Sequence, residues 1–176
     1  MAKIAQGIQV SIDYNADTKA GTWYKLSDHN RQPMGITYNL IESTDRMANG
    51  TLRKYIVARK FVISADWKDF PSLDSNLVDY STGGKASAWI KAFYEGNYGN
   101  PIYVKLIFAQ EDVVINSIPT DISYKDSKNT DGQVFLAYMS TFTYNVSKRR
   151  SSTSLPQTTT NNGYDYVDLT IEFTEV

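Results

Sequence analysis

The sequence contains no cysteine. This absence excludes disulfides, zinc–thiolate sites and a cysteine nucleophile. Histidine occurs once, as His29 in a polar segment, so we expect an exposed loop residue rather than part of a Ser-His-Asp triad. No apolar run approaches the roughly 18 residues of a membrane span, and Met1–Gly7 lacks the apolar core of a secretory signal. We therefore expect a protein that is made in the cytosol and is stabilised by packing alone.

The chain also lacks an excess of either charge. Eighteen lysines and arginines stand against 19 acids, for a net charge of -1, so we expect no sequence-specific nucleic-acid binding. Gly83-Gly84-Lys85 is not a phosphate loop, because that motif needs glycine at Asp79 and serine or threonine at Ala86. The aspartates between residues 121 and 131 fit no standard calcium loop. No acid pair stands out either, so we expect no enzymatic activity and no cofactor.

Aromatic residues, in contrast, are abundant at 13%, which is typical of strands and interfaces. Apolar and polar residues alternate with the period of a half-buried strand in several segments. These segments are Gly7–Tyr14, Trp23–Leu26, Ile36–Glu42, Tyr55–Trp67, Ile102–Phe108, Val134–Val146 and Tyr164–Val176, and Val113–Ile115 could extend the set. We expect a mainly β fold with one flanking α-helix, in a single domain over residues 1–176.

Two of these strands are unusually long. Tyr55–Trp67 and Val134–Val146 each keep one parity for about a dozen residues, whereas strands usually have five or six. The first should end at Phe70-Pro71-Ser72, and should bend near Arg59 and Lys60 or project past its own core to meet another subunit. Asn49-Gly50 predicts a hairpin before it, because both residues tolerate positive φ.

One segment, Ser81–Gly99, has helical spacing instead. Its apolar residues recur at offsets of three and four, namely Ala86, Trp89, Ile90, Phe93 and Tyr94. Ser81 or Thr82 can cap its start, and Gly96 or Gly99 can end it. We expect Trp89, Ile90 and Phe93 to anchor the helix to the sheet, and a change of Trp89 to alanine to cost about 3–5 kcal/mol.

Two further segments have the composition of extensions. Residues 148–163 form a polar tract that predicts a long loop, of a length that usually means function or disorder. Its first residues, Lys148, Arg149 and Arg150, could contact phosphate or an acidic partner, or could simply be a charged strand end. Residues 1–26 are a candidate N-terminal arm.

Several stretches together resemble tail structural proteins of long-tailed bacteriophages, a group often described as minor tail proteins. These stretches are Arg46–Tyr55, the strand ending in Trp67 before Phe70-Pro71-Ser72, Phe93-Tyr94-Glu95 with Tyr98-Gly99, Phe142–Arg149 and Asp168–Val176. The resemblance covers roughly residues 27–176. It implies a tail-tube-like β-sandwich or barrel with a flanking helix, whose subunits join in hexameric rings with a continuous inner barrel. It brings no active-site residue to this chain.

The resemblance makes the leading hypothesis a virion structural protein of the tail. Such a protein would assemble in the host cytoplasm with copies of itself and with other tail proteins, without a membrane. Arg59, Lys60 and the basic residues Lys148, Arg149 and Arg150 would contact adjacent subunits. The alternative is a glycan- or receptor-binding β-sandwich at the tail tip, which the tyrosine content supports. Aromatic residues clustered on an exposed concave face would favour the alternative, and aromatic residues in the core would favour the tube.

Overall fold

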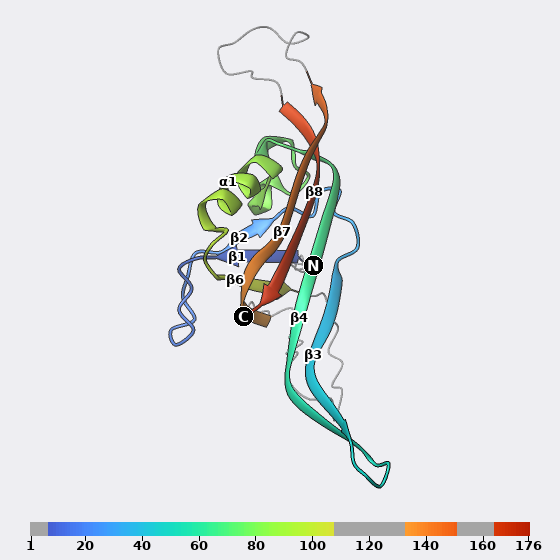
Figure 1. Cartoon of the computed structure of the whole chain (residues 1–176). Coiled ribbons are helices and arrows are strands. Elements are labelled where there is room, and N and C mark those ends of the chain that lie inside the picture. Colours follow the sequence, from blue (N-terminus) through green and yellow to red (C-terminus); the bar gives the residue numbers. More distant parts are fainter. Residues whose placement is uncertain (1–6, 108–132, 151–163) are drawn as a thin grey trace, which may run out of the picture.

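The computed structural model describes residues 7–107, 133–150 and 164–176, and it forms one eight-stranded sheet with a flanking helix (Figure 1). The strands are β1 (Gly7–Ser11), β2 (Tyr24–Leu26), β3 (Gly35–Arg46), β4 (Leu52–Pro71), β5 (Gly84–Lys85), β6 (Ile102–Ile107), β7 (Gln133–Arg150) and β8 (Tyr164–Glu175). The predicted class, mainly β with one flanking α-helix, is confirmed. The strand expected near Val113–Ile115 and most of the expected 148–163 loop lie outside the described residues.

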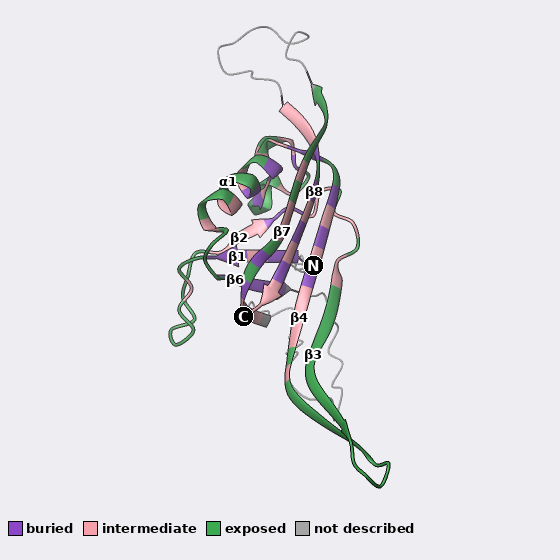
Figure 2. Ribbon diagram, in the orientation of Figure 1, coloured by how far each residue is buried: buried purple, intermediate pink, exposed green. Residues whose placement is uncertain are grey.

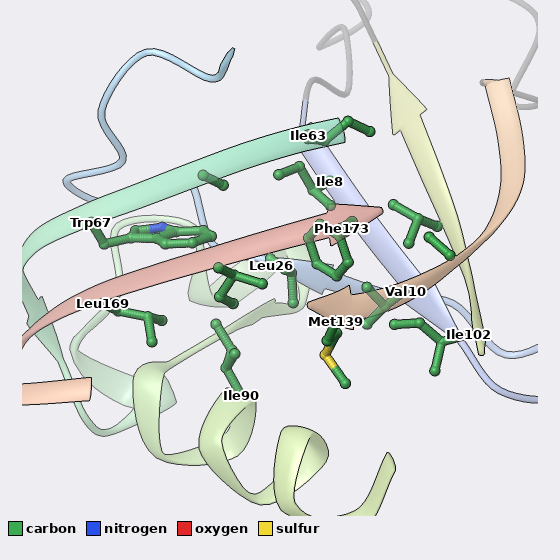
Figure 3. Packing of buried hydrophobic residues seen from close by; sticks show 14 of the residues in the cluster. Ile8, Val10, Leu26, Ile63, Trp67, Ile90, Ile102, Met139, Leu169 and Phe173 are labelled. Carbon is green, nitrogen blue, oxygen red and sulfur yellow. The ribbon is translucent and has the colours of Figure 1, made fainter. Parts of the chain in front are cut away.

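The sheet has the order β3-β4-β8-β7-β6-β1-β2-β5. Its neighbours are antiparallel except for β2 and β5, which are parallel. β1, β2 and β6 run across β4, β7 and β8 (Figure 1), so the sheet folds over and encloses the core between its two halves. Figure 3 shows Ile8, Ile63 and Phe173, from three different strands, in this cluster.

The expected N-terminal arm is wrong for Gly7–Ser11 and Tyr24–Leu26, because these residues form β1 and β2 of the sheet. β1 lies inside the sheet, where Ile8 pairs with Leu26 on one side and Leu106 on the other. Ile8, Val10 and Leu26 are at most 2% exposed. The alternating pattern therefore predicted the strand correctly, and burial of one face of β1 fixes its register in the sheet.

The helix α1 (Ser87–Asn97) is shorter than predicted. Residues 81–82, the expected caps, lie in the short 3-10 turn η2 (Tyr80–Thr82) instead. The residue before the helix is Ala86, and its N–H donates to Asp74 Oδ1 at 2.7 Å. The helix also continues through Gly96. A contact from another segment, rather than a local hydroxyl, therefore fixes where the helix starts.

The predicted anchor residues differ in how deeply they are buried. Ile90 is 1% exposed and points into the core (Figure 3). Trp89 and Phe93 are half-buried, with their rings stacked at 5.0 Å between centroids. Trp89 also meets Tyr24 of β2 at 4.9 Å. Ile90 therefore contributes the buried contact, and the two rings cover it.

Both predicted long strands are present, and β4 has 20 residues. Its inner half, from Val62 to Pro71, pairs with β8, and it ends at the predicted proline. Its outer half pairs with β3 and projects from the core (Figure 1). A register shift places Val57 as an extra residue, two positions before the expected bend at Arg59.

The predicted hairpin joins β3 to β4, although by a different turn. Met47 N–H donates to Thr51 O at 2.9 Å, and Gly50 N–H donates to Met47 O at 2.8 Å. Gly50 has φ of 80°, whereas Asn49 has no positive φ. The connection is thus a three-residue loop with glycine in the left-handed position, rather than a two-residue turn. Asn49 contributes its side-chain oxygen, which accepts the Thr51 N–H at 3.0 Å.

Because Ile90 is fully buried and Trp89 is only half-buried, truncating these two side chains should cost different amounts of stability. Ile90→Ala should lower the free energy of unfolding by about 2–5 kcal/mol, the range for a buried isoleucine. Trp89→Ala should cost less than a fully buried tryptophan would, because its ring is partly exposed. Urea denaturation of both variants tests this order, and a larger loss for Trp89→Ala would contradict the described packing.

Candidate assembly surface

Residues 36–46 of β3, residues 52–60 of β4 and the turn between them form a two-stranded ribbon, which we call the arm. Figure 2 shows that the arm is exposed along nearly its whole length. The β8 strand begins to pair with β4 only at Val62, so the pairs within the arm are β3–β4 pairs. An isolated two-stranded ribbon is marginally stable in water. The arm therefore has the character of a segment that is stabilised by a partner.

Large apolar side chains cover the arm. Those at least 36% exposed are Ile36, Tyr38, Leu40, Ile41, Met47, Leu52, Tyr55, Ile56 and Val57. They occupy both faces of the ribbon, because neighbouring residues such as Leu40 and Ile41 point to opposite sides. Large apolar side chains gathered in this number on one projecting ribbon are typical of an interaction site. The chemistry of the arm is therefore that of an interface.

The predicted contact residues Arg59 and Lys60 lie at the root of the arm. The Arg59 guanidinium lies 5.2 Å from the centre of the Tyr38 ring. Lys60 Nζ donates to the carbonyl oxygen of Val176, and Glu175 Oε2 accepts the Phe61 N–H at 3.2 Å. These contacts mark the point where pairing with β8 ends. Both basic residues are thus engaged within the chain.

The other predicted contacts, Lys148 to Arg150, lie at the far end of the molecule from the arm (Figure 1). The expectation that they begin a loop is wrong, since β7 continues to Arg150 and pairs there with β8. Lys148 Nζ lies 3.1 Å from Asp69 Oδ1, and Arg149 Nε lies 2.8 Å from Asp165 Oδ1. The hydrogen bond from Lys148 lowers the pKa of Asp69. Arg149 thus pairs with the neighbouring strand β8, whereas the ion pair of Lys148 reaches past β8 to β4.

A polar cluster that the sequence did not reveal connects β2 to the segment before α1. Ser27 Oγ donates to Asp79 Oδ1 at 2.5 Å, and Lys25 Nζ lies 3.0 Å from Asp79 and 3.1 Å from Asp28. Burial by itself would raise the pKa of Asp79, but hydrogen bonds from Ser27 and Lys25 outweigh it and lower that pKa. More than 50 positions separate Ser27 from Asp79, so no local motif could announce the cluster.

His29 belongs to the same region and is half-buried rather than exposed. Its Nδ1 accepts the Val78 N–H at 3.0 Å, and its own N–H donates to Ser27 Oγ at 3.0 Å. The Ser27 hydroxyl is fully buried and donates to Asp79 rather than to the imidazole. Lys25, Ser27, His29 and Asp79 thus hold the segment before α1 beside the end of β2, and we call these four residues the clamp. The clamp lacks the serine–imidazole hydrogen bond of a catalytic triad.

Comparisons of the sequence with protein-family models and with curated proteins found no match. Among the residues that the structure describes, no group of three or more potential metal ligands comes together. Within the same ranges, no helix is long and apolar enough to cross a membrane. Among the described residues, the exposed apolar side chains of the arm are therefore the strongest indication of a binding surface.

The lowered pKa of Asp79 predicts an acid-sensitive contribution to stability. Its carboxylate stabilises the fold above its unfolded pKa of about 4, and this contribution is lost as the pH falls below that value toward the folded pKa. Asp79→Asn should cost about 1–2 kcal/mol at neutral pH, because the charged hydrogen bonds with Lys25 are weakened.

Thermal unfolding between pH 3 and pH 7 measures this effect. Asp79→Asn should show a smaller loss of stability on acidification than the wild type. The exposed loop variant Asp17→Asn is the control and should follow the wild-type curve. If the melting temperature of Asp79→Asn fell with pH as steeply as that of the wild type, the clamp would not be the source of the acid sensitivity.

Proposed function

We propose that this chain is a structural subunit of a phage tail that assembles with copies of itself into a ring or tube and docks neighbouring tail proteins. The observation that carries the proposal is the arm, a projecting ribbon with large apolar side chains on both faces. The resemblance of residues 27–176 to tail structural proteins supports it. In this proposal the protein is not an enzyme and resides in the virion tail, where assembly buries the arm.

The apolar surface of the arm is large enough to drive association. Fully burying one exposed large apolar side chain contributes about 1.5–3 kcal/mol. The nine on the arm are 36–76% exposed, so burying what remains exposed of all nine would contribute about 7–14 kcal/mol. The loss of translational and rotational freedom costs about 4–15 kcal/mol. Contacts of this number are thus of the size needed to offset that cost. In a ring each subunit contacts two neighbours, so the free energy of association per subunit is larger than in a dimer with one such contact.

The alternative, a glycan-binding module, has one cluster in its favour. Tyr14 lies 5.1 Å from Trp23 and 5.2 Å from Tyr103 between ring centroids. However, the Lys105 ammonium lies 4.5 Å from the centre of the Trp23 ring and occupies a face that a sugar would need. Trp67 is buried in the core. The placement of the tryptophans therefore favours assembly over sugar binding.

A matched pair of isoleucines tests the role of the arm in assembly. Ile56, on the arm, and Ile12, outside it, are 60% and 58% exposed. Ile56→Thr keeps a β-branched residue in the strand and removes apolar contact area, so it should weaken assembly by about tenfold or more in concentration. Ile12→Thr should assemble as the wild type does.

Light scattering over a range of concentrations, together with negative-stain electron microscopy, measures the assembly state. Rings or tubes of the wild type would support the proposed function. Equal assembly by the two threonine variants would show that the arm is not the contact. Binding of glycans by a wild type that remains monomeric would support the alternative instead.

A further inference from the structure

The sulfur atoms of this chain all belong to methionine, because the sequence contains four methionines and no cysteine. Oxidants that act on thiols therefore have no target here, whereas the thioether of a methionine can still be converted to a sulfoxide. Three of the four methionines, Met34, Met47 and Met139, lie in the described residues. The place of each in the fold decides what its oxidation would disturb.

The three methionines differ in how far solvent reaches them. Met139 is 5% exposed and lies in the core (Figure 3). Met34 is half-buried and packs against the core. Met47 is 41% exposed and lies at the outer end of the arm, directly after β3. An oxidant in solution reaches an exposed sulfur more readily than a buried one, so Met47 should react first.

Main-chain contacts, rather than its side chain, hold Met47 in place. The Met47 N–H donates to Thr51 O at 2.9 Å, and the Met47 carbonyl oxygen accepts the Gly50 N–H at 2.8 Å. Its side chain lies outside the hydrophobic core that the described residues form. A chemical change at the sulfur of Met47 should therefore alter the surface of the arm and leave the core folded. The same change at Met139 would disturb the core itself.

Oxidation of Met47 changes an apolar side chain into a polar one. A hydroperoxide transfers one oxygen atom to the sulfur, so an S–O bond forms and the O–O bond breaks. The proton of the transferred oxygen moves to the departing one, which leaves as water or an alcohol. The thioether is oxidised by two electrons and the peroxide is reduced by two. A sulfoxide oxygen accepts hydrogen bonds, and burying such a group without a donor is unfavourable.

We propose that Met47 is a redox-sensitive modification site, at which oxidation to the sulfoxide by hydroperoxides prevents the arm from docking while the chain stays folded. The effect of the modification rests on the proposed self-assembly and adds a chemical control to it. An assembly that buries the arm would cover the sulfur, so the modification acts on free subunits. Methionine sulfoxide reductases, which restore the thioether, reverse it.

Peptide mapping after peroxide treatment tests the order of reaction. Trypsin cleaves after lysine and arginine, so it releases Met34, Met47 and Met139 in three separate peptides, and Arg46 and Arg53 bound the Met47 peptide. The unassembled wild type is treated with dilute hydrogen peroxide, and catalase stops the reaction at intervals. The Met47 peptide should be the first of the three to gain the mass of one oxygen atom. Equal or earlier reaction of Met139 would overturn the proposed site.

The concentration needed for assembly, measured by light scattering before and after peroxide, tests the effect. The wild type and the control Met34→Leu should each need at least about tenfold more protein after treatment. Two methionine sulfoxide reductases, one for each sulfoxide epimer, should restore the original value. Met47→Leu has an apolar side chain of similar volume without a thioether, so it should need the same concentration before and after treatment. Circular dichroism establishes that each sample stays folded.

The outcomes separate this site from the proposed function. If peroxide weakened the assembly of Met47→Leu as much as that of the wild type, the role of Met47 would be overturned. Unchanged assembly of a wild type whose Met47 is oxidised would overturn it as well, and both results leave the proposed function standing. A wild type that stays monomeric at every concentration before treatment would overturn the proposed function and, with it, the control of assembly by Met47.

Discussion

The continuity of β4 is the constraint on which the rest of the structure depends. Its 20 residues serve the core at one end and the arm at the other. Ile63, Ala65 and Trp67 alternate into the core and are at most 1% exposed, and this fixes the register of the strand. The same backbone then continues into the arm without an intervening loop. The direction in which the arm leaves the molecule is therefore set by core packing.

Polar contacts determine the placement of the helix in a similar way. Lys25 and Ser27 hold Asp79, and Asp74 accepts the Ala86 N–H at the start of α1. The connection from β4 to the helix is thus fixed by charged groups together with Leu77, which is buried in the core. Ile90 then completes the core from the helix side. The helix is positioned by the sheet and does not itself organise the fold.

Local signals in the sequence predicted the parts of the fold that depend on local chemistry. The period of two identified both long strands, and Asn49-Gly50 identified the hairpin, because strand alternation and turn chemistry act over a few residues. The start of α1 and the clamp at Asp79 depend on residues far apart in the sequence and could not be predicted. Lys148 and its neighbours appeared to be loop residues because their partners, such as Asp165, come from another strand.

The sequence predicted that β4 projects from the core, but it did not predict which side chains of the arm are exposed. Tyr55 and Val57 share the parity of the core residues Ile63 and Ala65, so the pattern alone does not distinguish a covered strand from an exposed one. The excessive length of the strand predicted its projection, and the structure adds which side chains remain exposed.

The end of β8 marks the point on β4 where the exposure of the arm begins. The Glu175 carboxylate accepts a hydrogen bond from the Phe61 N–H, and the Lys60 ammonium donates one to the Val176 carbonyl. Charged side chains therefore replace the β4–β8 backbone hydrogen bonds at the point where β8 ends. Such contacts close the root of the arm against further pairing, and its outer part has no third strand beside it among the residues that the structure describes. A sheet with a two-residue strand at one end and an open ribbon at the other is inherently directional. Head-to-tail assembly requires that asymmetry, whereas a symmetric dimer would need one edge that is complementary to itself.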